Sequence, residues 1–232
     1  MKIKSIASGS SGNCYIVSDS SSKLMIECGV KIQKIKEAID FDFNSISGCL
    51  ITHEHGDHAN CHKKLSEFYG VDIFTAKETG ESLELKRFKP VQVKKWYRID
   101  SFDVMPFDVK HDAVNPLGFY IISRATGESL LFATDTYLIK YKFKNLDYIM
   151  IEANYDLNIL NQNVESGRVN RIIRNRVIKS HMSIDNAIDY LSKIDKSNLK
   201  KVYLIHLSND NSNEKEFIKR VRHEVFVPCE AF

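Results

Sequence analysis

The sequence has little of what marks unstructured or cross-linked chains. It holds only 4 prolines among 232 residues, shows no repeat or low-complexity tract, and is 43% hydrophobic. This composition excludes an intrinsically disordered or fibrous protein. The 5 cysteines are scattered and form no Cys-x-x-Cys pair. That spacing argues against a disulfide framework and favours free, buried thiols in a reducing compartment.

Long hydrophobic runs are absent too. No segment approaches the ~20 apolar residues that cross a bilayer, and the N-terminal MKIKSIASGSSGNCY lacks the apolar stretch of a secretion signal. We therefore expect a cytoplasmic protein without a membrane anchor. The net charge is +3, which permits an anionic substrate but is less basic than a dedicated nucleic-acid-binding domain.

Short runs rich in β-branched and aromatic residues predict a mixture of strands and helices. The expected strands are Ile3–Ala7, Cys14–Val17, Lys23–Glu27, Gly48–Thr52, Val71–Thr75, Phe102–Val109, Leu117–Ser123, Ser129–Ala133, Asp147–Glu152, Lys201–His206 and Glu224–Val227. The expected helices are Lys31–Ile39, Cys61–Tyr69, Ile184–Ile194 and Glu214–Arg222. This order predicts an α/β protein with two mixed sheets sandwiched between helices (αββα), and the length suits a single domain over residues 1–232.

A histidine-rich loop, THEHGDH, follows one of the predicted strands at residues 52–58. His53 and His55 stand two apart in extended chain, so their side chains project to the same side and can bind one cation. A turn at Gly56 lets Asp57 and His58 face a second cation close by. Imidazole and carboxylate donors suit zinc or a similar transition metal. The loop therefore predicts a two-metal site.

This HxHxDH pattern resembles the signature of the metallo-β-lactamase superfamily. The segments GSSGN (9–13), LMIECG (24–29), HMS (181–183) and HLSNDN (206–211) are similar to the YycJ/WalJ-like branch, which is related to RNase Z. The resemblance runs from Ile3 to Asn213. It implies the metallo-β-lactamase fold and a nuclease-like hydrolase that cleaves phosphodiesters.

The resemblance also implies seven metal ligands, three of which follow later strands in the expected order. The first metal is assigned His53, His55 and His111, the second Asp57, His58 and His206, and Asp135 is assigned to bridge them. Zinc is the expected metal, with manganese as the alternative. The superfamily usually has an aspartate where this chain has Glu27, so the role of that carboxylate is open.

In such a site a hydroxide held between the two cations attacks phosphorus, and the cations stabilise the charge that develops. Asp57 is expected to orient this hydroxide. His181 matches a histidine that protonates the leaving group in RNase Z-like enzymes, and the competing reading is a cap for the following helix. Ser10, Ser11 and Asn13 are expected to contact the substrate from the GSSGN loop, although a plain tight turn explains the loop equally well.

Five basic residues precede His181 at spacings that place several on one helical face. They are Arg168, Arg171, Arg174, Arg176 and Lys179. This face is either a surface that follows phosphates or simply a solvated helix face. No aromatic residue is interleaved with it to stack bases.

Other functions remain open at this stage. The same chemistry on a cyclic or small nucleotide is the nearest alternative to a nuclease on DNA or RNA. A thioester hydrolase of the glyoxalase type normally carries a larger helical C-terminal region. A non-enzymatic, zinc-stabilised nucleic-acid-binding protein normally closes its metal with four ligands that include cysteine. The expected partner is a nucleic acid or nucleotide, and a homodimer is open.

Overall fold

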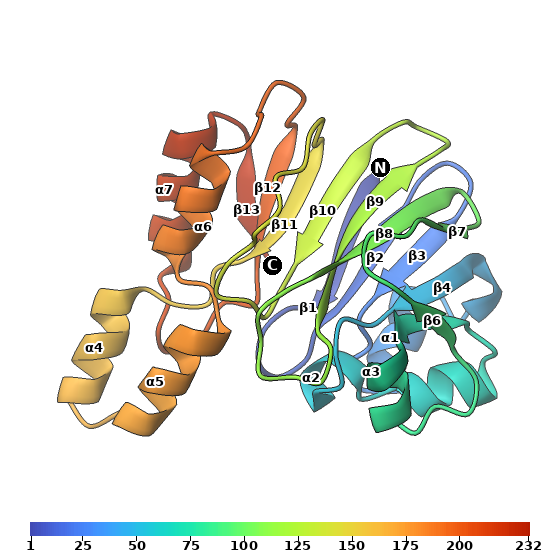
Figure 1. Cartoon of the computed structure of the whole chain (residues 1–232), viewed down its shortest axis with the longest axis horizontal. Helices are drawn as coiled ribbons and strands as arrows, with labels where there is room; N and C mark the ends of the chain where they lie inside the picture. The colour runs from blue at the N-terminus through green and yellow to red at the C-terminus, as the bar shows by residue number, and fades with distance from the viewer. The chain divides into compact units, whose positions relative to one another are not determined.

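The computed structural model describes all 232 residues, which form two compact units (Figure 1). Unit 1 comprises Met1–Asp108 and Ala113–Ser129, and unit 2 comprises Val109–Asp112 and Leu130–Phe232. The predicted single domain over residues 1–232 stays a prediction.

Unit 1 contains a six-stranded mixed sheet. Its strands, in spatial order, are β1 (Lys2–Ala7), β2 (Cys14–Ser18), β3 (Lys23–Ile26), β4 (Ile46–Leu50), β5 (Ile73–Ala76) and β6 (Lys89–Val91). The first three pair antiparallel, and β3 to β6 pair parallel. Because β3 and β4 are parallel neighbours, the segments that follow them begin at the same edge of the sheet. The histidine-rich loop is the segment after β4.

Three more strands of unit 1 form an antiparallel set: β7 (Tyr97–Ile99), β8 (Phe102–Asp108) and β9 (Leu117–Ser123). The helical elements of the unit are short. They are α1 (Ile32–Ala38), α2 (Gly56–Ala59), α3 (Lys77–Ser82), a 3₁₀ turn at Phe43–Ser45 and a π-helical turn at Lys64–Phe68.

The core of unit 1 includes four of the five cysteines, which are Cys14, Cys28, Cys49 and Cys61. All of them are free thiols, as the sequence predicts. Burial raises the pKa of the Cys28 thiol well above its ordinary value, so this side chain behaves as a small apolar group.

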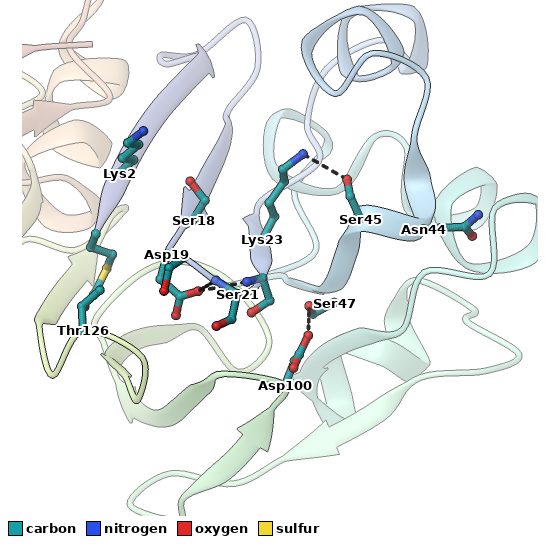
Figure 2. A pocket seen from close by; sticks show the side chains of 13 residues that line it. Lys2, Ser18, Asp19, Ser21, Lys23, Asn44, Ser45, Ser47, Asp100 and Thr126 are labelled. Carbon is teal, nitrogen blue, oxygen red and sulfur yellow. Dashed lines mark hydrogen bonds between the residues drawn. The ribbon is translucent and has the colours of Figure 1, made fainter.

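A polar cavity of about 640 Å³ lies at the end of β2 away from Asn13 (Figure 2). Its central anion is Asp19, whose carboxylate accepts hydrogen bonds from the backbone of Ser21 and Ser22 and from the hydroxyls of Ser101 and Ser123. These bonds lower the pKa of Asp19 to about 2, against a smaller opposing effect of partial burial. The Asp19 carboxylate is therefore satisfied by hydrogen bonds from within the unit.

Unit 2 contains four parallel strands, with α6 and α7 beside β12 and β13 (Figure 1). In order they are β10 (Ser129–Ala133, in this unit from Leu130), β11 (Tyr148–Glu152), β12 (Lys201–Ile205) and β13 (Cys229–Ala231). The helices are α4 (Leu157–Glu165), α5 (Arg171–Ser180), α6 (Ile184–Ser192) and α7 (Glu214–Val225). The interiors of β10, β11 and β12 are hydrophobic and buried, as expected for parallel strands. No helix in the chain is both long and apolar enough to cross a bilayer.

The sequence patterns place most elements within two residues of their observed bounds. The predicted strand Glu224–Val227 is wrong. Phe217, Val221 and Val225 recur every four residues and are buried, so α7 continues through Val225. It ends at Phe226, whose φ of 58° is left-handed, and the last strand follows as β13. The patterns do not predict α3, α4, β6 and β7, which are short or weakly apolar.

Candidate metal centre

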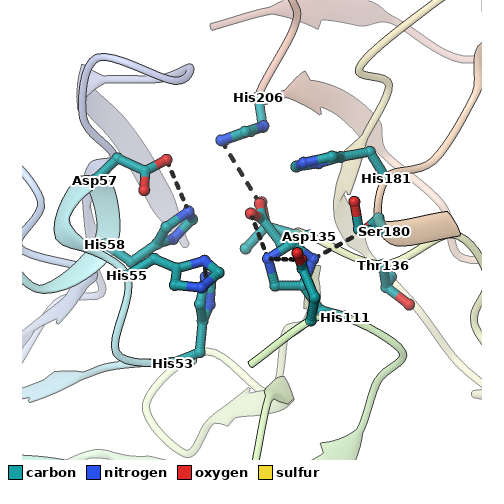
Figure 3. A network of polar contacts seen from close by, with 12 residues as sticks. His53, His55, Asp57, His58, His111, Asp135, Thr136, Ser180, His181 and His206 are labelled. Atoms are coloured by element: carbon teal, nitrogen blue, oxygen red, sulfur yellow. Dashed lines mark hydrogen bonds and ion pairs between the residues drawn. The ribbon is translucent and has the colours of Figure 1, made fainter. Parts of the chain in front are cut away.

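The histidine-rich loop of unit 1 places its donor atoms in two close pairs. The Nε2 atom of His53 lies 3.1 Å from Nδ1 of His55, and Nε2 of His58 lies 3.3 Å from an Asp57 carboxylate oxygen (Figure 3). His53 and His58 are fully buried, whereas Asp57 is partly exposed. The loop therefore brings a donor atom of His53 close to His55, and one of Asp57 close to His58.

Buried polar groups of unit 1 orient these rings. The Thr52 hydroxyl contacts Nδ1 of His53 at 2.8 Å, which leaves Nε2 to face His55. Glu27 is fully buried, and its carboxylate lies 3.4 Å from Nδ1 of His58. Burial raises the pKa of Glu27, and the His58 ring offsets this only in part. Glu27 therefore lies against the His58 ring, where the superfamily usually has an aspartate.

Asn13 braces the same loop from the GSSGN turn. Its backbone N–H donates to the Asp57 carbonyl at 2.7 Å, and its side-chain amide donates to the carbonyls of Gly9 and Asp57. It is 1% exposed. Asn13 therefore works as a brace for Asp57, and only Ser10 and Ser11 of the predicted substrate contacts are exposed. Their contact with a substrate stays a prediction.

Unit 2 collects its donors where three neighbouring parallel strands end. Asp135 follows β10, Glu152 ends β11 and His206 follows β12. Since carboxyl ends of parallel strands share one edge, these side chains meet there. Asp135 and His206 have left-handed φ angles of 45° and 55°, a strain typical of functional positions.

His111 and His206 both face Asp135 (Figure 3). Nε2 of His111 lies 3.4 Å from one Asp135 oxygen, and Nε2 of His206 lies 3.6 Å from the other. Nδ1 of His111 donates to the Ser180 carbonyl at 2.9 Å, which fixes the ring with Nε2 toward Asp135. Burial lowers the pKa of His111, although Asp135 opposes this, so the ring tends to be neutral and able to bind a metal.

Glu152 lies among these donors, and no sequence motif identifies it. It is fully buried, accepts hydrogen bonds from the backbone N–H groups of Thr136 and Met182, and contacts Nδ1 of His181 at 2.6 Å. Burial alone lowers the pKa of His181, but the Glu152 carboxylate outweighs this and the net pKa is raised. A carboxylate directly after an apolar strand, the same signal that identifies Asp135, would have found it.

His181 does not cap the following helix. It ends α5, and the side chain of Ser183 caps α6 by accepting the N–H of Asn186 at 3.1 Å. The competing reading of His181 as a helix cap is therefore wrong. Instead, the ring of His181 stacks on that of His206 at 5.5 Å between centroids. Its nitrogen lies within 4.8 Å of donor atoms of Asp135, Glu152 and His206.

The donor distances fit divalent cations. Two ligand atoms bound ~2.0–2.1 Å from one tetrahedral zinc lie about 3.3 Å apart. The four pairs described above, two in each unit, are separated by 3.1, 3.3, 3.4 and 3.6 Å. Each pair consists of two residues that the sequence assigns to one metal. Each unit therefore offers a set of donors that fits divalent metal ions.

A model of the beta-lactamase superfamily domain matches residues 24–207. This is more than half of the chain, and the chain therefore belongs to the β-lactamase superfamily.

Three similar proteins agree with this. The chain is 29% identical over 244 residues to exodeoxyribonuclease WalJ of Streptococcus pneumoniae serotype 2 (strain D39), with 97% of this chain and 87% of WalJ covered. The metallo-β-lactamase fold protein YhfI from Bacillus subtilis aligns with a TM-score of 0.76 at 13% identity, over 99% of this chain and 95% of YhfI. Human tRNase Z, short form, aligns with a TM-score of 0.61 at 13% identity, over 90% and 93%. The predicted fold, an αββα sandwich of the metallo-β-lactamase type, and the resemblance to the WalJ-like, RNase Z-related branch are confirmed.

Proposed function

We propose that the chain is a metal-dependent phosphodiesterase that acts as a nuclease on a DNA strand. The observation that carries the proposal is the donor geometry, in which four pairs of ligand atoms have the separation expected around a metal ion. Superfamily membership supports a hydrolase, and the similarity to an exodeoxyribonuclease supports DNA as the substrate.

The proposed ligands are the seven residues predicted from the sequence. They are His53, His55, Asp57, His58, His111, Asp135 and His206. The cations supply a water of lowered pKa and stabilise negative charge on the phosphoryl oxygens. The mixed imidazole and carboxylate set favours zinc, with manganese as the alternative.

The chain's own residues provide orientation and a proton. Asp57 is partly exposed beside the buried His58, which suits a carboxylate that both binds metal and orients the attacking water. Glu152 holds Nδ1 of His181, so Nε2 is left to donate a proton to the leaving oxygen. Glu152 is thus a positioning residue for His181.

The proposal includes a cytoplasmic location, which the five free thiols support because a reducing compartment maintains them. It also includes one functional domain over residues 1–232, since the superfamily match at residues 24–207 draws on both units. A homodimer stays a prediction.

The test is hydrolysis by the purified protein, with zinc or manganese added, on a panel of single-stranded DNA, RNA and cyclic nucleotides. Asp135→Ala is the loss-of-metal control. Thr136→Ser, at the neighbouring residue, is the matched control. The Thr136 hydroxyl accepts from the Lys110 N–H and donates to the Leu138 carbonyl. Serine keeps this hydroxyl, so the variant should keep activity.

Cleavage of DNA by the wild type and not by Asp135→Ala is the expected result. Cleavage of RNA alone moves the substrate to RNA, and cleavage of cyclic nucleotides alone makes the protein a small-nucleotide phosphodiesterase. If protein that carries two metals per chain cleaves none of these substrates, the result contradicts the phosphodiester chemistry and favours the thioester alternative.

A further inference from the structure

Unit 2 contains a cavity of about 400 Å³ that none of the proposed metal ligands lines. Three tyrosines and three lysines are part of its lining, beside apolar residues and Asp189, which pairs with Lys193 at 2.6 Å. The six are Tyr137, Tyr141, Tyr190, Lys140, Lys142 and Lys193. We refer to the cavity as the tyrosine–lysine cavity. Tyrosine rings present faces on which a base can stack, and lysine ammonium groups attract phosphates. Rings and cations together are groups that a nucleotide can use.

Tyr190 gives independent evidence for a polar ligand. It belongs to α6 and is 8% exposed, and its hydroxyl is buried without a hydrogen-bond partner. Burial raises the pKa of this hydroxyl, which keeps it protonated and able to donate. A buried hydroxyl without a partner is destabilising, and native proteins rarely leave one. Tyr190 also lines the tyrosine–lysine cavity, so a ligand bound there is a candidate partner for this hydroxyl.

A second cavity shares one lining residue with the tyrosine–lysine cavity and is also lined by one proposed metal ligand. It measures about 320 Å³ and is lined by Tyr137, which it shares with the tyrosine–lysine cavity, and by the proposed ligand His111. Lys110 and Lys179 also line it, and both are exposed and form no ion pair. Their ammonium groups are available to phosphate oxygens between the two cavities.

We propose that the tyrosine–lysine cavity binds one nucleotide of a single-stranded nucleic acid, at a position away from the phosphodiester that is cleaved. The base of this nucleotide stacks against tyrosine rings, and the Tyr190 hydroxyl donates to its base or sugar. Lys110 and Lys179 bind neighbouring phosphates of the same strand. A paired base stays within its duplex and does not enter such a cavity, so the strand is single. This inference rests on the proposed phosphodiesterase function and specifies its substrate.

The decisive variant is Tyr190→Phe, which removes only the hydroxyl. With metal-loaded enzyme, KM for a single-stranded oligodeoxynucleotide should rise about three- to tenfold, the effect of one lost hydrogen bond, with kcat unchanged. Kinetics on bis(p-nitrophenyl) phosphate, which is too small to reach the cavity, should not change. The melting temperature should not fall, because the lost hydroxyl has no partner in the free protein. The matched control is Tyr203→Phe on β12, outside the cavity lining.

A charge reversal tests the cationic side of the cavity. Lys142→Glu should weaken oligonucleotide binding and flatten its dependence on salt concentration. Lys215→Glu, an equally exposed lysine on α7 away from the cavity lining, is the control and should change neither.

The inference is overturned if Tyr190→Phe has the wild-type KM on the oligonucleotide. It is also overturned if the variant loses the same factor in kcat/KM on both substrates. A wild type that hydrolyses neither substrate refutes the phosphodiesterase proposal instead. In that case fluorescence anisotropy of the labelled oligonucleotide decides: weaker binding by Tyr190→Phe than by wild type supports the cavity, and equal or absent binding overturns it. Thymidine monophosphate that binds as tightly as the oligonucleotide, with the same dependence on Tyr190, identifies a free nucleotide as the occupant and overturns the strand assignment.

Discussion

Gly29 lies against the backbone of the metal-binding loop, and Gly29→Ala should therefore unfold or distort unit 1. A Cβ at this position would lie 1.6 Å from the Asp57 carbonyl oxygen and 2.6 Å from the His58 nitrogen. Real Cβ atoms essentially never approach closer than 3.0 Å, so the two backbone segments must separate by at least 1.4 Å. Both contacted atoms are backbone, and no side-chain rotation can relieve the clash.

This separation breaks the hydrogen bonds that hold the loop. The Gly29 N–H donates to Asn13 at 2.9 Å, Asn13 donates to Asp57 at 2.7 Å, and Cys28 donates to His58 at 2.8 Å. Overpacking costs roughly 1–3 kcal/mol and each lost bond about 0.5–1.5 kcal/mol. Summed over overpacking and the three bonds, we expect a total of about 3–7 kcal/mol, which for a chain of this size lowers Tm by roughly 6–28 °C.

The assay is thermal unfolding followed by circular dichroism, together with metal content after loading with zinc. Gly56→Ala is the matched control, because Gly56 lies inside the motif but a Cβ there meets nothing within 4 Å. It should keep both Tm and metal. A Gly29→Ala protein that melts with the wild type, or a Gly56→Ala protein that is equally destabilised, refutes the reasoning.

Four further substitutions each test a single side chain. Asp19→Asn should lower the free energy of unfolding by about 1–2 kcal/mol at pH 7. The folded pKa of Asp19, about 2, lies below the ordinary 3.8, so its stabilising effect is complete above pH 3.8 and is lost as pH falls toward 2. Urea unfolding at pH 7 and pH 3 checks this, and a difference that grows on acidification contradicts it. Asp57→Ala should abolish hydrolysis while thermal unfolding stays cooperative, and retained turnover would remove Asp57 from the reaction. His181→Ala should slow hydrolysis by about 10²–10⁴-fold without loss of metal, and Glu152→Gln should act in the same direction. Metal loss in His181→Ala, measured by elemental analysis, would make His181 a ligand instead.

Sequence alone predicts those parts of the site that a local pattern encodes. Four of the proposed ligands fall within six consecutive positions after one strand: His53, His55, Asp57 and His58. Their pairing follows from chain geometry. Asp135 also lies directly after a strand and is found through the order of the superfamily's ligands.

The contacts that the sequence does not reveal are long-range. Glu152 reaches His181 across 29 positions, and Asn13 reaches Asp57 across 44. Nothing at either residue distinguishes a brace from an ordinary strand end or turn until the strands are paired. The same holds for Tyr190, whose orphan hydroxyl is visible only once α6 is packed.

The most direct test of the central claim is a metal titration of activity. Protein stripped of metal is titrated with zinc, and hydrolysis of single-stranded DNA is measured alongside the metal bound per chain. The account predicts no activity without metal and full activity when two ions are bound per chain. Hydrolysis that a chelator does not diminish would contradict it, and so would the absence of DNA hydrolysis by protein with two ions bound.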